Sequence, residues 1–116
     1  MGDEAEVAAE TMQEVVAPAA TRYGMIDAGG GVLHAVADTY LEGCAEARAD
    51  GFGQLIDLTA VDYLTYGAPR NLTAAVEAER FEVVTQLINH STRERIRIRT
   101  QVNADEPVLP TLFDLW

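Results

Sequence analysis

The sequence predicts an α+β fold of two layers, a mainly antiparallel sheet with helices packed on one of its faces. Residues 81–88 and 95–102 alternate apolar and polar side chains with a period of two, which is typical of strands. Residues 32–49 instead repeat apolar side chains at the 3.6-residue spacing of an amphipathic helix. A chain of 116 residues, 48% of them hydrophobic, is sufficient for one domain with its own core.

The first 31 residues are predicted to precede the main domain, which we place at residues 32–116. Residues 3–16 favour an acidic helix that ends at Pro18. Its glutamates recur at i, i+4, which costs a few tenths of a kcal/mol per pair, so we expect this helix to need a partner surface or to stay disordered. The three glycines at 29–31 lack the lysine and the spacing of a phosphate-binding loop, and they predict a flexible linker.

Candidate catalytic and metal-binding residues are few. Cys44 lies on the apolar stripe of the predicted helix and is expected to be a small core residue rather than a nucleophile. His34 is expected at the start of that helix and His90 in a turn, both as surface or capping residues. Neither has a second ligand at a metal-binding spacing. We therefore expect no catalytic residue, no metal and no cofactor.

Three strands are predicted after the helix. Residues 54–63 are expected to form a mostly apolar strand that is buried on at least one face, and residues 64–79 connect it to the two alternating segments. A loop of four residues between these segments would place Leu87 opposite Ile96 and Thr85 opposite Ile98, with apolar partners on one face. The expected core consists of Phe81, Val83, Leu87, Ile96, Ile98, Leu33, Val36 and Tyr40.

Two aspartates interrupt the strand at 54–63. Asp57 and Asp62 are five positions apart, so they point to opposite faces and lie about 16 Å apart along the strand. This geometry argues against a shared acid–base centre. If Asp57 is buried it needs a partner, and an arginine of a neighbouring strand is the expected one.

The charge distribution excludes some partners and suggests others. The net charge is −11, and all eight basic residues are arginines, so nucleic acid is excluded as a partner. The sequence has no run of about 20 apolar residues that could span a membrane. Arg95, Arg97 and Arg99 form a cationic stripe, and arginine pairs well with carboxylates across protein interfaces. The stripe predicts a partner interface; the alternative is a solvated strand face balanced by Glu82.

The C-terminal residues predict the start of a helix. Thr111 and Asp114 are placed to cap it, and an apolar run ending at Trp116 follows the cap. So short a helix is not stable by itself. We therefore expect a domain truncated at its C-terminus, which is frayed after Pro110 or buries Trp116 in a neighbouring copy.

Several segments together resemble one known family. The string Asp57–Tyr63 resembles its central strand, and the segments Arg80–Val84 and Arg95–Arg99 resemble the two strands that follow. Pro107, Pro110 and Asp114–Trp116 resemble the approach to its signature helix. In this order, the segments resemble the N-terminal α/β domain of the thirty-kilodalton (C) subunit of NADH-quinone oxidoreductase, which is respiratory complex I.

This resemblance implies a function. It implies a non-catalytic subunit of a proton-translocating complex, in the peripheral arm on the cytoplasmic side of the cell membrane. The chief partner would be the quinone-site (D) subunit, and the interface residues would include Arg95, Arg97, Arg99 and Trp116. Two alternatives stay open: the equivalent subunit of a related membrane-bound hydrogenase, and a small stand-alone α+β ligand-binding domain or enzyme. A homo-oligomer of the isolated chain also stays open.

Overall fold

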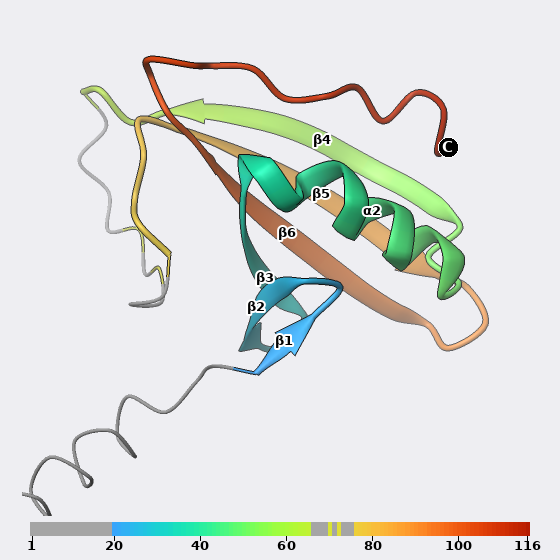
Figure 1. The fold of residues 1–116 in the computed structure, drawn as a ribbon. Coiled ribbons are helices and arrows are strands. Elements are labelled where there is room, and N and C mark those ends of the chain that lie inside the picture. The colour runs from blue at the N-terminus through green and yellow to red at the C-terminus, as the bar shows by residue number, and fades with distance from the viewer. Residues whose placement is uncertain (1–19, 66–69, 71, 73–75) are drawn as a thin grey trace, which may run out of the picture.

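The computed structural model describes residues 20–65, 70, 72 and 76–116. These residues form one six-stranded mixed sheet in the order β1-β2-β3-β6-β5-β4, with helix α2 packed across one face (Figure 1). The strands are β1 (Thr21–Arg22), β2 (Met25–Gly29), β3 (Val32–Val36), β4 (Gln54–Asp62), β5 (Phe81–Asn89) and β6 (Glu94–Val102). A short 3-10 turn, η1 (Ala37–Thr39), leads into α2 (Tyr40–Ala49). The predicted α+β class with two layers is confirmed.

The hairpin of β5 and β6 has the predicted register. Leu87 pairs with Ile96 and Thr85 pairs with Ile98, across a loop of residues 90–93. Period-two alternation allows only registers that keep the apolar side chains on one face, so the pattern defines this pairing locally. The predicted strand at 54–63 corresponds to β4, which pairs antiparallel with β5. The expectation that one of its faces is buried is wrong, because β4 is an edge strand whose residues are mostly exposed.

The predicted helix at 32–49 is correct only in its second half. Residues Val32–Val36 form strand β3, which lies parallel to β6, and the α-helix begins at Tyr40. Leu33 and Ala35 of β3 are buried on the α2 side, and His34 is buried on the opposite side. A strand with both faces covered carries apolar residues in a nearly continuous run, which can coincide with helical spacing.

The three glycines form a turn of the sheet rather than a flexible linker. Gly29, Gly30 and Gly31 have φ values of 84°, 64° and 81°, and they join β2 to β3. A Cβ on Gly31 would lie 2.7 Å from the carbonyl oxygen of Arg95, so only glycine fits there without a shift. Residues 21–31 are therefore part of the sheet, while the predicted acidic helix at 3–16 lies outside the described residues.

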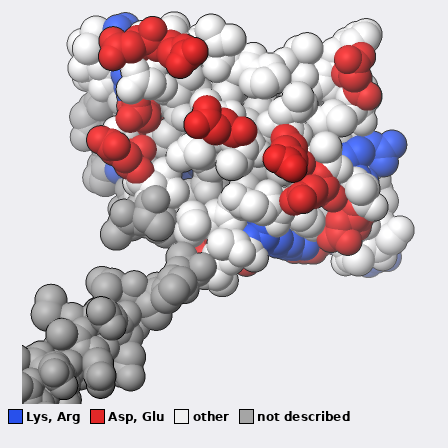
Figure 2. All heavy atoms as spheres, in the orientation of Figure 1, with Lys and Arg blue, Asp and Glu red and all other residues white. Residues whose placement is uncertain are grey.

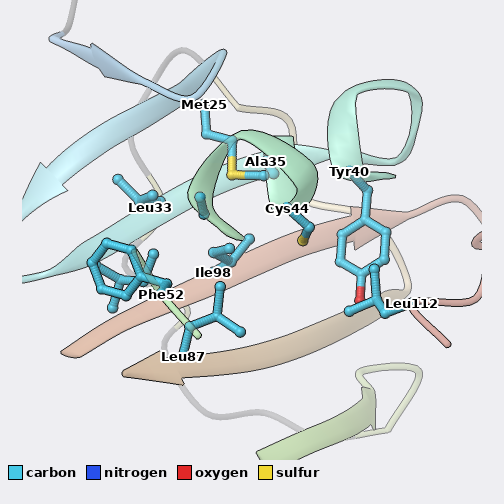
Figure 3. Close-up of a cluster of buried hydrophobic side chains, with 11 residues drawn as sticks. Met25, Leu33, Ala35, Tyr40, Cys44, Phe52, Leu87, Ile98 and Leu112 are labelled. Atoms are coloured by element: carbon cyan, nitrogen blue, oxygen red, sulfur yellow. The ribbon is translucent and has the colours of Figure 1, made fainter. Parts of the chain in front are cut away.

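The hydrophobic core lies between α2 and the sheet (Figure 3). It contains Met25, Leu33, Ala35, Tyr40, Cys44, Ala47, Phe52, Leu87, Ile96, Ile98 and Leu112. Three predicted core residues differ: Val36 is 43% exposed, and Phe81 and Val83 are half-buried. Val36 belongs to the other face of the sheet, and α2 does not extend over the end of β5 that carries Phe81 (Figure 1).

The C-terminal segment forms a turn instead of the predicted helix start. The Phe113 N–H donates to the Thr111 hydroxyl at 3.1 Å, and the Leu115 N–H donates to the Leu112 carbonyl at 2.9 Å. The Trp116 indole N–H donates to the Phe52 carbonyl at 3.0 Å, and its ring packs half-buried on the core. Trp116 therefore packs on the core of its own domain, and the expectation of a frayed end or of a contact with a neighbouring copy stays a prediction.

Candidate functional site

The candidate site is the sheet face opposite α2, which we call the arginine face. Ile96 and Ile98 of β6 point into the core under α2. Because side chains alternate along a strand, Arg95, Arg97 and Arg99 all lie on the other face. The structure thus brings the three predicted arginines together on one surface, but it gives them different surroundings.

One end of the arginine face carries a buried polar network. The carboxylate of Glu82 on β5 lies 3.0 Å from a terminal guanidinium nitrogen of Arg99 and also accepts an N–H from the side-chain amide of Gln101 at 2.7 Å. Arg99 donates a further hydrogen bond to the carbonyl of Arg70 at 2.6 Å. Glu82 and Gln101 are buried, so their polar groups are satisfied within the protein.

Arg70, which lies between β4 and β5 in the sequence, joins this network. Its guanidinium carbon lies 3.7 Å from the ring centre of Tyr63, a cation–π contact. The same group donates to the Glu79 carbonyl and to the side-chain carbonyl of Gln101. Arg99 is therefore engaged inside its own domain. Glu82 is its counter-charge, as the alternative for the stripe predicted, but this end of the face is covered rather than solvated.

His34 lies in the same covered region. It is 2% exposed, and its pKa is lowered by burial and by the nearby cation of Arg99. The prediction of a surface or capping histidine is therefore wrong for His34, because residue 34 is in a buried strand. His90 is exposed in the hairpin loop, as predicted, and its ring bonds to the side chain of Gln54.

The other end of the arginine face is open. Arg95 and Arg97 are exposed, and neither side chain has a hydrogen bond or ion pair to any residue that the structure describes. Half-buried apolar side chains flank them: Val32 pairs with Arg97, and Ile88 pairs with Arg95. Two exposed guanidinium groups on a partly apolar surface are suited to carboxylates of another protein.

The α2 face has the opposite electrostatic character. Figure 2 shows acidic groups spread across this face and few basic ones. Against a net charge of −11, the open end of the arginine face is a local cationic area. The fold therefore separates a predominantly acidic surface from this cationic one.

Other reactive groups do not assemble into a site within the described part of the chain. Cys44 is fully buried, and burial raises the pKa of its thiol to about 12, which keeps it protonated at neutral pH. Asp57 is exposed, so the expected arginine partner is not needed; its carboxylate accepts the N–H of Leu58. No cluster of three His, Cys, Asp or Glu residues that could hold a metal occurs among the residues described. None of the described helices has the length and apolar character required to cross a membrane.

The alternating pattern predicts the stripe of three arginines, but it does not predict the polar network that covers Arg99 and leaves Arg95 and Arg97 exposed. Trp116, the fourth predicted interface residue, does not lie on the arginine face, since it binds the Phe52 carbonyl beside the core. Glu82 and Gln101 occupy outward positions of the alternating strands, as the arginines do, so their burial had no signal in the pattern. Arg70 lies in a connection without periodicity, and only the folded chain brings it to Gln101.

Comparison with known proteins gives consistent similarities. The family described as respiratory-chain NADH dehydrogenase, 30 Kd subunit, matches residues 33–116. The NADH-quinone oxidoreductase subunits designated C in Burkholderia mallei (strain NCTC 10229) and Burkholderia pseudomallei (strain 668) are each 38% identical to this chain over 84 residues. Each alignment covers 69% of this chain and 40% of the relative, so the chain spans less than half the length of these curated relatives.

A solved structure shares the fold. A trypsin-resistant fragment (1–134) of Nqo5 superposes with a TM-score of 0.63 at 30% sequence identity. The match covers 96% of this chain and 80% of the fragment. The arrangement of the sheet and the helix is therefore shared well beyond the aligned sequence motifs.

Proposed function

This chain belongs to the family of the 30-kDa subunit of respiratory-chain NADH dehydrogenase, and we propose that it is a non-catalytic structural component of a proton-translocating NADH-quinone oxidoreductase. The observation that carries this proposal is the open end of the arginine face. There Arg95 and Arg97 stand exposed and unpaired among the described residues, beside apolar side chains of β3 and β5. A surface of this kind favours contact with another protein over chemistry on a small substrate.

The proposed partner is the quinone-site subunit in the peripheral arm. Carboxylates of the partner would form bidentate pairs with Arg95 and Arg97, since the planar guanidinium group matches carboxylate geometry. Val32 and Ile88 would supply the apolar area that such an interface buries. Arg99 would not touch the partner. Its ion pair with Glu82 would instead stabilise the two strands, β5 and β6, that carry the contact surface.

We place the protein on the cytoplasmic side of the cell membrane, attached through other subunits rather than through lipid. A net charge of −11 repels the anionic lipids of the inner leaflet. Attachment through protein contacts avoids this repulsion. The open end of the arginine face would be the surface that makes the contact.

Co-purification tests the proposal. A tagged chain is co-expressed with the quinone-site subunit, and the double variant Arg95→Ala/Arg97→Ala is compared with the parent. Arg48→Ala on α2 is the matched control, because it removes an exposed arginine from the opposite layer. We expect the double variant to lose the quinone-site subunit while the control retains it. Equal recovery of that subunit with all three proteins would contradict the proposed docking surface.

A further inference from the structure

Strand β4 forms one edge of the sheet, and its ladder determines which backbone groups point outward. The N–H of Tyr63 donates to the carbonyl of Arg80, which lies directly opposite, at 2.8 Å. Directly opposed residues in an antiparallel ladder alternate between hydrogen-bonded and non-hydrogen-bonded pairs. Leu58, Ala60 and Asp62 therefore occupy non-hydrogen-bonded pairs, and their N–H and C=O groups point away from β5.

Two aspartates cap N–H groups on either side of this outward-facing stretch. The carboxylate of Asp57 accepts the N–H of Leu58 at 2.9 Å, and that of Asp62 accepts the N–H of Leu64 at 3.0 Å. Between these capped groups, the N–H groups of Ala60 and Asp62 have no partner among the described residues. The edge is thus blocked against a long added strand but open to a short one.

An apolar hollow lies beside the open part of the edge. It has a volume of about 330 Å³ and lies between β4 and the C-terminal segment, on the side of the sheet that α2 covers. Its lining includes Tyr40, Leu58, Ala60, Val83, Leu109 and Leu112. The small side chain of Ala60 leaves the hollow accessible from the edge, and Leu58 is 49% exposed at its rim.

We propose that β4 accepts a short extended segment of a partner protein as an added strand. Backbone hydrogen bonds to Ala60 and Asp62 would hold the segment, and a large apolar side chain on the α2 side would enter the hollow. Strand addition combines these two elements, main-chain bonds for affinity and pockets for alternate side chains. This surface is separate from the arginine face, so the inference goes beyond the proposed function and does not depend on it.

The charge of the protein indicates a basic segment rather than a second copy of this chain. Two copies would each bring a net charge of −11 to the contact. Asp57 has no ion pair with a described residue and stands exposed next to the open stretch of the edge. A lysine or arginine flanking the apolar positions of the segment would be placed to neutralise it.

A synthetic peptide tests the proposal. The probe is a nine-residue peptide in which valine and leucine alternate with arginine and threonine, studied by NMR with the intact chain. Two further peptides carry N-methyl groups on one or the other set of alternate residues. Strand addition requires only one set of peptide N–H groups, so we expect one N-methyl peptide to bind as the parent does. The other should bind at least about tenfold more weakly, through the loss of its hydrogen bonds to β4.

Hydrogen exchange and one variant locate the binding. The bound parent peptide should slow exchange of the amide protons of Ala60 and Asp62, and of Leu58 less, because Asp57 already bonds it. Ala60→Pro should abolish binding, since proline is tolerated at an outward-facing edge position but offers no N–H. No binding, equal binding of the two N-methyl peptides, or unchanged exchange at Ala60 and Asp62 would each overturn the proposal. If Ala60→Pro does not fold, the N-methyl pair decides.

Discussion

Glu82 on β5 and Arg99 on β6 form an ion pair with 3.0 Å between carboxylate oxygen and guanidinium nitrogen, and their side chains are only 4% and 16% exposed. Because of this contact, the three arginines of β6 have different surroundings: Arg99 is covered, and Arg95 and Arg97 are exposed. Arg99 contributes to the fold, whereas Arg95 and Arg97 remain available to a partner. Stability should therefore depend on Arg99, and binding on Arg95 and Arg97.

Breaking the buried pair should be strongly destabilising. Glu82→Gln leaves the guanidinium of Arg99 without its counter-charge, and removal of one member of a buried pair costs about 3–5 kcal/mol of unfolding free energy. Arg99→Leu should cost a similar amount. The double variant should cost less than the sum of the two, because no uncompensated charge remains. Urea denaturation of the four proteins gives these values, and additive losses would show that the two residues do not interact.

Gly31→Ala should destabilise the protein through its backbone. Alanine at a φ of +81° is strained by about 1–3 kcal/mol, and its Cβ would also press on the carbonyl of Arg95 at 2.7 Å. Gly30→Ala is the matched control, because its φ is +64° but a Cβ there meets nothing within 4 Å. Thermal unfolding should show a larger loss for Gly31→Ala. A larger loss for Gly30→Ala would contradict the prediction that the close approach of residue 31 to the Arg95 carbonyl adds to the cost.

Replacing the two exposed arginines should weaken the complex without weakening the fold. If Arg95 and Arg97 are desolvated against carboxylates of the quinone-site subunit, the double alanine variant should lose about 2–5 kcal/mol of binding free energy. A position at the rim would give a loss within about 1 kcal/mol. Titration calorimetry distinguishes the two cases, and denaturation should show unfolding midpoints close to that of the parent.

The exposed pair of Asp62 and Arg80 should be visible in a pH titration. Hydrogen bonds from Arg80 and from the Leu64 N–H lower the pKa of Asp62 from 3.8 to about 2. A carboxyl whose pKa is lowered by folding stabilises the folded state above its unfolded pKa. That contribution is lost as the pH falls from about 4 towards 2. NMR of the side-chain carboxyl carbon of Asp62 should give a titration midpoint near 2, and the midpoint should rise in Arg80→Ala. An unchanged midpoint would show that Arg80 does not lower the pKa of Asp62.

The purified chain should show neither a chromophore nor NADH oxidation. Cys44 is buried on the α2 side, His34 is buried on the opposite side, and His90 is exposed in the hairpin loop, so these groups cannot act on one ligand. An absorbance spectrum, metal analysis and an NADH assay check this expectation. A stoichiometric flavin, cluster or metal would contradict the proposed non-catalytic role.

The sequence by itself determined the hairpin of β5 and β6, down to the pairs Leu87–Ile96 and Thr85–Ile98. It could do so because a period of two and a short loop are local features, and a slip by one residue would expose the apolar face. The edge strand β4 followed from its mostly apolar run, and the core position of Tyr40 followed from the 3.6-residue spacing of its helix. Leu33 is in the core as expected, but it lies in a strand rather than in the predicted helix. Three of the segments that resemble the family, Asp57–Tyr63, Arg80–Val84 and Arg95–Arg99, lie in or directly beside these strands. The fourth, with Pro107, Pro110 and Asp114–Trp116, lies in the irregular C-terminal segment.

Tertiary structure alone decided the rest. Val32–Val36 became a strand because β6, more than sixty positions away in the sequence, offers a parallel partner, and a short apolar run is compatible with helix or strand. The same long-range folding brings Arg70 to Gln101 and its carbonyl to Arg99, and so covers one arginine while two others with the same local pattern stay exposed. Which charge is buried depends on what covers it, and the covering segment here comes from a connection that has no periodicity of its own.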